Sequence, residues 1–164
     1  HTGDLASARN VEARMRELAA RAEEAGQSDH AAYIEIDRRI LAGWIAHAEG
    51  DDGGAEEEMR TAVELEQGIQ KHPVTPGSLL PAAESLGDLL LEMGRLRDAV
   101  AAYEASLEAW PARYRSLLGA ARAARAAGDD STARRHYAAL REVVSDVEVP
   151  RLGVAEARAF MEEE

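Results

Sequence analysis

The feature that most limits how this 164-residue chain can fold is an internal repeat. In each copy a glycine is followed five residues later by alanine and, after four more residues, by a large apolar side chain. The complete copies are Gly50-Ala55-Met59, Gly94-Ala99-Tyr103 and Gly128-Ala133-Tyr137, and a partial copy is Gly3-Ala8-Glu12. A repeat of this length predicts stacked units, each of which buries its apolar face only against its neighbours.

The spacing within each copy predicts a hairpin of two helices. A small residue, Gly43, Gly87 or Ala121, lies twelve positions before each alanine. A small residue in one helix and an alanine early in the next allow two antiparallel helices to approach closely, and the glycine supplies the turn between them. The large residue one turn later then fills the space beside the next hairpin.

Apolar residues recur at helical spacing almost everywhere, so we expect an all-α fold. The predicted helices cover residues 4–25, 29–49, 54–70, 78–93, 96–109, 112–127, 130–145 and 151–161. Asp29, Ser78 and Asp130 lie near helix starts, while glycines follow several helix ends, as capping requires. These segments predict a short right-handed solenoid of antiparallel hairpins with flanking N- and C-terminal helices.

The pattern resembles the tetratricopeptide repeat, a helical hairpin of about 34 residues. Residues 80–113 match it best, through Leu86, Gly87, Gly94, Ala99, Tyr103 and Pro111. This segment departs from the family at Ala83, Leu90 and Ser106, where Trp, Tyr and Ala are usual. Residues 114–147 match through Leu117, Gly128, Ala133 and Tyr137, and residues 36–70 match more loosely. The resemblance implies a scaffold that binds a protein or peptide, has no enzymatic activity and needs no cofactor.

We expect residues 1–164 to form a single domain. Its parts are a leading helix 4–25, a long hairpin 29–70, a proline-rich loop 71–77, hairpins 78–110 and 112–145, and a closing helix 151–161. The leading segment resembles the second helix of a hairpin whose first helix is missing. We therefore expect a piece of a longer chain, with an apolar face that is open to self-association.

Composition narrows the range of partners. The net charge is −12, and residues 1–72 carry 16 acidic but only 8 basic side chains, so nucleic-acid binding is not expected. No apolar run approaches the roughly 18 residues of a membrane span, which predicts a soluble protein without membrane insertion. Cysteine is absent, and the preference for Arg over Lys suggests a GC-rich, bacterial coding sequence.

In proteins of the resembled family, the first helix of each hairpin lines a concave groove. Carried over by register, the partner-binding positions here are Asp37, Ile40, Trp44 and His47 in the first hairpin, Glu84, Asp88, Leu91 and Glu92 in the second, and Arg115, Leu118, Arg122 and Arg125 in the third. We call these twelve residues the first-helix positions. Trp44 and Ile40 would provide apolar contacts to the partner.

Arg115, Arg122 and Arg125 fall on one stripe of the third first helix, which we call the arginine stripe. Guanidinium groups suit carboxylates, so the stripe predicts binding to an acidic segment of a partner. Two alternatives remain open, since the stripe can be a solvated face or can pair with the acidic middle repeat.

Other chemistries have weaker signals. His47, His72, Glu84 and Asp88 could bind a metal only through tertiary proximity, because no His-x-x-x-His or similar ligand spacing occurs. The loop around His72 and Thr75 reads better as a stiff spacer than as a ligand contact. No catalytic nucleophile, paired acid or phosphate-binding loop is indicated. The alternatives to a scaffold are a metal- or small-ligand-binding repeat protein and a regulatory segment of a larger assembly.

Overall fold

The computed structural model describes residues 4–69, 80–144 and 153–162. Within them the chain is all helical, which confirms the predicted fold class. The helices are α1 (Leu5–Glu24), α2 (Ser28–Ala48), α3 (Asp52–Gly68), α4 (Ala82–Glu92), α5 (Leu96–Ala109), α6 (Tyr114–Ala126), α7 (Asp130–Val143) and α8 (Val154–Glu162). The chain divides into two compact units, residues 1–86 and 87–164, with the boundary inside α4.

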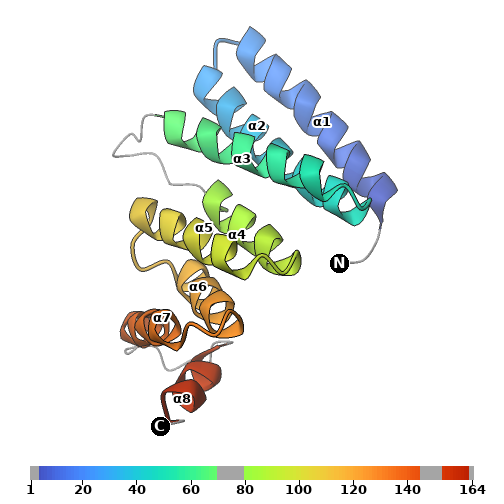
Figure 1. Ribbon diagram of the computed structural model, residues 1–164. Coiled ribbons are helices and arrows are strands. Elements are labelled where there is room, and N and C mark those ends of the chain that lie inside the picture. The colour runs from blue at the N-terminus through green and yellow to red at the C-terminus, as the bar shows by residue number, and fades with distance from the viewer. Residues whose placement is uncertain (1–3, 70–79, 145–152, 163–164) are drawn as a thin grey trace. The chain divides into compact units, whose positions relative to one another are not determined.

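In unit 1, α2 packs between α1 and α3, and consecutive helices lie side by side (Figure 1). In unit 2, α6 packs against both α5 and α7, and α8 packs against α7. The tight turns are made as predicted, because Gly26, Gly50, Gly94 and Gly128 all have positive φ angles between 72° and 85°. Glycine adopts this conformation at little cost.

The predicted close approach of paired helices is present in both units. A Cβ atom added to Gly43 would lie 2.9 Å from Cγ of Met59, and one added to Gly87 would lie 2.8 Å from Cδ1 of Tyr103. The Tyr103 ring also reaches the next hairpin, since a Cβ on Gly119 would lie 2.5 Å from its Cε1. The large residue of the repeat therefore fills the space between two hairpins, as the spacing predicts.

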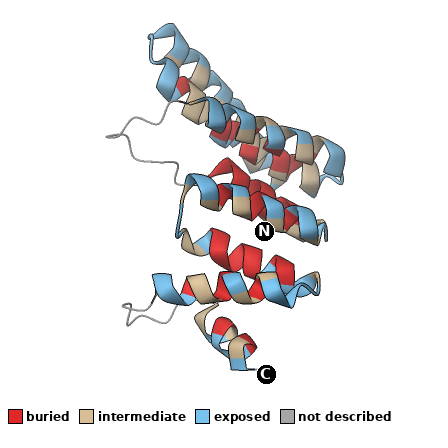
Figure 2. Cartoon of the chain, turned by 60° about the vertical axis from the view of Figure 1, so that its left-hand side comes forward, coloured by how far each residue is buried: buried red, intermediate tan, exposed pale blue. Residues whose placement is uncertain are grey.

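The central helix α6 is the most extensively buried element of unit 2 (Figure 2). Its small side chains pack with Tyr137 and Leu140 of α7 and with Ala157 and Phe160 of α8. Ser106, which departs from the family pattern, hydrogen bonds to Ser116 of α6 over 3.0 Å and is fully buried. This pairing explains how a hydroxyl is accommodated where the family has alanine.

Three predicted helix starts differ from the structure. The helix predicted from residue 78 begins at Ala82, because Pro81 has no amide hydrogen and restricts the residue before it. The helix predicted from residue 112 begins at Tyr114, since Ala112 has a φ of 62°. The closing helix predicted from residue 151 begins at Val154, after Gly153 with a φ of 90°.

Asp51 corrects a fourth boundary. Its side chain accepts a hydrogen bond from the amide of Gly54 over 2.9 Å, so α3 starts at Asp52 instead of Gly54. Asp129 caps α7 in the same way through Thr132, while Asp130 is the first residue of the helix. The proline-rich loop 71–77 and Ser78 lie outside the described residues.

Candidate functional site

The first-helix positions of α2 combine a core residue with a half-buried aromatic pair. Ile40 is buried, so it stabilises unit 1 and offers no open surface. The Trp44 and His47 rings meet edge to face, with centroids 6.2 Å apart and an interplanar angle of 71°. His47 Nδ1 lies 2.7 Å from Oδ1 of Asp52 at the start of α3. Asp37 is exposed, and partial desolvation raises the pKa of its carboxyl.

The first-helix positions of α4 also differ in exposure. Glu84 is fully buried in the structure, whereas Asp88 and Leu91 are half-buried and Glu92 is exposed. Asp88 accepts a hydrogen bond from the hydroxyl of Tyr103 over 2.6 Å. The same carboxylate receives one from Arg115 of α6 over 3.1 Å. Asp88 thus links the two helices of its own hairpin to the first helix of the next.

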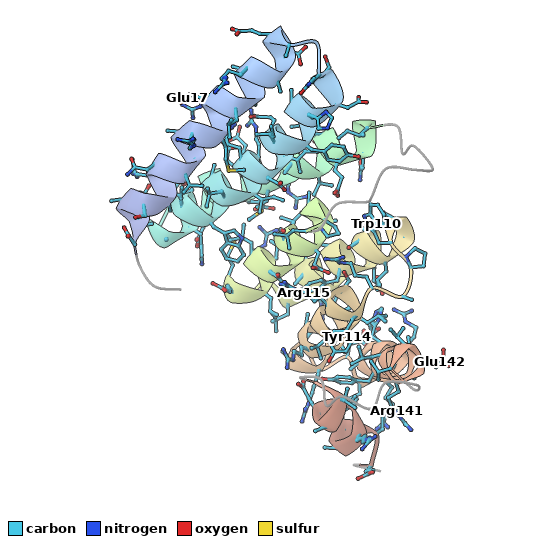
Figure 3. All side chains as sticks on the ribbon, turned by 180° about the vertical axis from the view of Figure 1, so that it is seen from behind. Glu17, Trp110, Tyr114, Arg115, Arg141 and Glu142 are labelled. Atoms are coloured by element: carbon cyan, nitrogen blue, oxygen red, sulfur yellow. The ribbon has the colours of Figure 1, made fainter. Side chains whose placement is uncertain are left out.

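Every arginine of the arginine stripe has a partner within unit 2. Arg115, labelled in Figure 3, pairs with Asp88. Arg122 donates to Glu156 of α8 from Nε and Nη2, over 3.0 and 2.8 Å to the same oxygen. The Arg125 guanidinium lies 5.1 Å from the centroid of the Phe160 ring. The alternative that the stripe pairs with the acidic middle repeat therefore describes Arg115. Arg122 pairs instead with the closing helix.

Leu118, the fourth α6 position, is buried beneath the start of α8. A Cβ atom added to Gly153 would lie 2.5 Å from Cδ1 of Leu118, so the chain passes closely over this side chain. Leu118, like Ile40 and Glu84, contributes to packing in the structure. Whether the remaining first-helix positions bind a partner stays a prediction.

Glu156 is a site residue that the sequence patterns did not reveal. Besides Arg122, it accepts a hydrogen bond of 2.5 Å from the hydroxyl of Tyr137, which is fully buried. Desolvation opposes ionisation of Glu156, but hydrogen bonds from Arg122 and Tyr137 outweigh it and lower the pKa of the carboxyl. Desolvation, with the neighbouring carboxylate, raises the pKa of Tyr137 to about 12. The available signal was the interval of 34 residues from Arg122 to Glu156, the length of one repeat.

Two open cavities lie between neighbouring helices, one in each unit. One, of about 550 Å³, is enclosed by α5, the end of α6 and the start of α7. The other, of about 400 Å³, is enclosed by α1, α2 and α3. Asp129 and Arg135 line the first where Asp51 and Glu57 line the second, at the same repeat positions. Because both units form the cavity although Arg135 reverses the charge of Glu57, we attribute it to hairpin stacking and not to a dedicated ligand site.

The metal hypothesis gains no support from the described residues. Among residues 4–69, 80–144 and 153–162, no three His, Cys, Asp or Glu side chains gather as metal ligands would. His47 contacts Asp52, and Glu84 is buried. His72 lies outside the described residues. Nor does any helix in the described part of the chain have the length and apolar character needed to cross a bilayer.

Stacked antiparallel hairpins with side chains presented along their first helices define the class of an all-α helical-repeat protein similar in fold to the tetratricopeptide repeat. Among solved structures, the chain is similar to "MamA RS-1 ArsTM double mutant", a tetratricopeptide-like helical-repeat protein. The TM-score is 0.52 at 15% sequence identity, over 87% of this chain and 77% of that one. No family model and no curated protein matches the sequence. The likeness therefore concerns the fold.

Proposed function

We propose that the chain is a non-catalytic binding module that recognises a protein or peptide partner through the first helices of its hairpins. A helical-repeat fold supports a binding role at the level of architecture, because such folds present extended surfaces without a closed active site. In unit 2 the presented groups are Asp88 and Glu92 of α4 and Arg115 and Arg122 of α6.

The observation that carries this proposal is that two arginines of the arginine stripe form exposed ion pairs with carboxylates of the chain itself. Arg115 and Arg122 remain largely exposed while they pair with Asp88 and Glu156. Such surface ion pairs contribute only about 0–1 kcal/mol each, so a partner's carboxylate can compete for the same guanidinium at small cost. The proposed ligand is a peptide segment rich in Asp or Glu.

In unit 1, Trp44 is the proposed apolar contact, because its ring is half-buried beside His47. Partly exposed aromatic side chains are frequent anchors in protein interfaces. A metal- or small-ligand-binding role has no described cluster in its favour, so we do not propose it.

The test is a selection from a library of random peptides on the immobilised chain. We expect acidic sequences to be enriched, and we expect the selected peptides to lose affinity for the Arg115→Glu variant by about tenfold or more. Arg60→Glu, on an exposed part of α3, is the matched control and should retain binding. Enrichment without acidic residues, or equal binding to Arg115→Glu, would argue against the proposal.

A further inference from the structure

The closing helix α8 docks on unit 2 through three side chains spaced along one face. Glu156 binds Arg122 and Tyr137, Ala157 is fully buried, and Phe160 is almost fully buried. The Phe160 ring lies 5.2 Å from the Tyr137 ring, centroid to centroid. Its faces also meet two cations, since the Arg125 and Arg134 guanidiniums lie 5.1 and 5.4 Å from the ring centroid.

The repeat register explains why this surface requires a carboxylate from outside its own hairpin. In the preceding hairpin, the Tyr103 hydroxyl donates to Asp88 of that hairpin's first helix. The residue 34 positions after Asp88 is Arg122, a second donor, and the residue 34 positions after Tyr103 is Tyr137. Arg122 and Tyr137 are therefore two neighbouring donors, and α6 has an arginine at the position where α4 has the acceptor Asp88. An unpaired buried hydroxyl is costly, so a helix that covers Tyr137 is favoured when it brings a carboxylate to these donors, as α8 does.

The helix that fills this place has little stability of its own. α8 has nine residues, whereas isolated helices shorter than about 12–15 residues are marginal in water. Its order therefore depends on the three docked side chains. The ion pair between Arg122 and Glu156 is partly exposed, which limits its contribution and makes it sensitive to salt.

We propose that α8 is an internal ligand that occupies, in cis, a receptor surface for a short acidic helix of a partner protein. The receptor consists of Arg122, Arg125, Arg134 and Tyr137. It recognises a carboxylate, a small residue directly after it and an aromatic residue four positions after the carboxylate, as in Glu156, Ala157 and Phe160. This inference rests on the proposed binding function and specifies one ligand and its regulation.

Charge favours a partner over a second copy of this chain as the competing ligand. Helices α6 and α7 with the turns before them, residues 113–143, carry seven arginines against Asp129, Asp130 and Glu142, while α8 itself carries the cation Arg158. A more acidic helix therefore gains attraction that α8 lacks. A second copy can offer only the same contacts as α8, and the tethered α8 competes at a roughly millimolar effective concentration.

The experiment uses a fluorescein-labelled peptide of residues 153–162 in which Arg158 is replaced by Glu. Fluorescence anisotropy measures its binding to the full wild-type chain and to the full Glu156→Gln/Phe160→Ala variant, in which α8 is weakened. We expect the variant to bind at least about tenfold tighter, because its tethered competitor is weakened. Adding Arg122→Ala to this variant should weaken binding by about tenfold, and a peptide with Gln at position 156 should bind equally poorly.

Circular dichroism establishes that each variant is folded, and the single variant Glu156→Gln, with an expected gain of a few-fold, replaces the double variant if the latter unfolds. Equal binding by wild type and the weakened variant, or binding that ignores Arg122, would overturn the proposal. Concentration-dependent dimerisation of wild type that Phe160→Ala abolishes would assign the surface to a second copy and would also overturn it. If selected acidic peptides depend on Arg115 while this peptide fails, only the inference about α8 fails.

Discussion

Replacement of Gly119 by alanine should destabilise the protein, although the same change stabilises most helices. Alanine exceeds glycine in helix propensity by about 1 kcal/mol. In α6, however, the new Cβ would lie 2.5 Å from Cε1 of Tyr103. That ring cannot move away easily, because Gly87 also lies against it and its hydroxyl is bonded to Asp88. Overpacking of a core costs about 1–3 kcal/mol, and the gain in helix propensity offsets about 1 kcal/mol of it, so we expect a net loss of up to about 2 kcal/mol.

Urea denaturation followed by circular dichroism measures this loss, with Gly68→Ala as the control. Gly68 is also helical, but nothing lies within 4 Å of the position of its added Cβ, so this variant should gain up to about 1 kcal/mol. In a Tyr103→Leu background, Gly119→Ala should lose most of its effect, because the ring that it meets is gone. A Gly119→Ala variant stabilised as much as Gly68→Ala would show that the ring relaxes freely and would refute the reasoning.

Three further predictions concern buried polar groups. Glu12→Leu should cost about 1–3 kcal/mol in urea denaturation, because it leaves the buried Arg38 with fewer partners, and adding Arg38→Leu should recover most of the loss; an unchanged single variant would contradict this. Burial lowers the pKa of His136 despite its contact with Glu104, so the unfolded chain binds the proton first and stability should fall as pH drops below about 6.5. Melting temperatures of wild type and His136→Gln across pH 5–8 check this prediction, and parallel curves would count against it. Tyr137→Phe should accelerate amide hydrogen exchange in α8 but not in α5, and unchanged exchange in α8 would show that the hydroxyl does not hold this helix.

Local spacing made most of the fold predictable. The close approach of Gly87 to Tyr103 follows from residues within one hairpin, and the turn glycines mark each reversal directly. The helix starts were harder, since Pro81 and Ala112 act through single backbone conformations that periodicity does not register.

The candidate site was less predictable, because burial and pairing depend on the neighbouring layer. Register places Glu84 and Leu118 among the first-helix positions, yet the structure buries both. The repeat register identifies Arg122 as a surface cation. It cannot show that α8 contacts Arg122, because residues 145–152 between them do not follow the repeat. Only the 34-residue interval from Arg122 to Glu156 hints at that contact.

The first inter-hairpin contact shows how a departure from the repeat can be compensated. Glu12 stands where the other copies have Met59, Tyr103 or Tyr137, and Arg38 stands at the register position of the buried residues Ala82 and Ser116. Arg38 is 6% exposed and donates to Glu12 over 2.5 Å and to Glu35 over 2.6 Å. Removing one partner of a desolvated ion pair is costly, so each departure reduces the cost of the other.

The consequence is that α2 favours a neighbouring helix with a carboxylate at the position of Glu12 over one with an apolar side chain there. A hairpin that presents an apolar side chain at the position of Glu12 would leave Arg38 without this carboxylate, and a first helix with alanine at the position of Arg38 would leave Glu12 with only the exposed Arg16 of its own helix as a cation. The contact between α1 and α2 therefore discriminates against the apolar pairings used elsewhere in the chain. Burial of an ion pair adds little net stability, but it penalises exchange of either partner for an apolar residue.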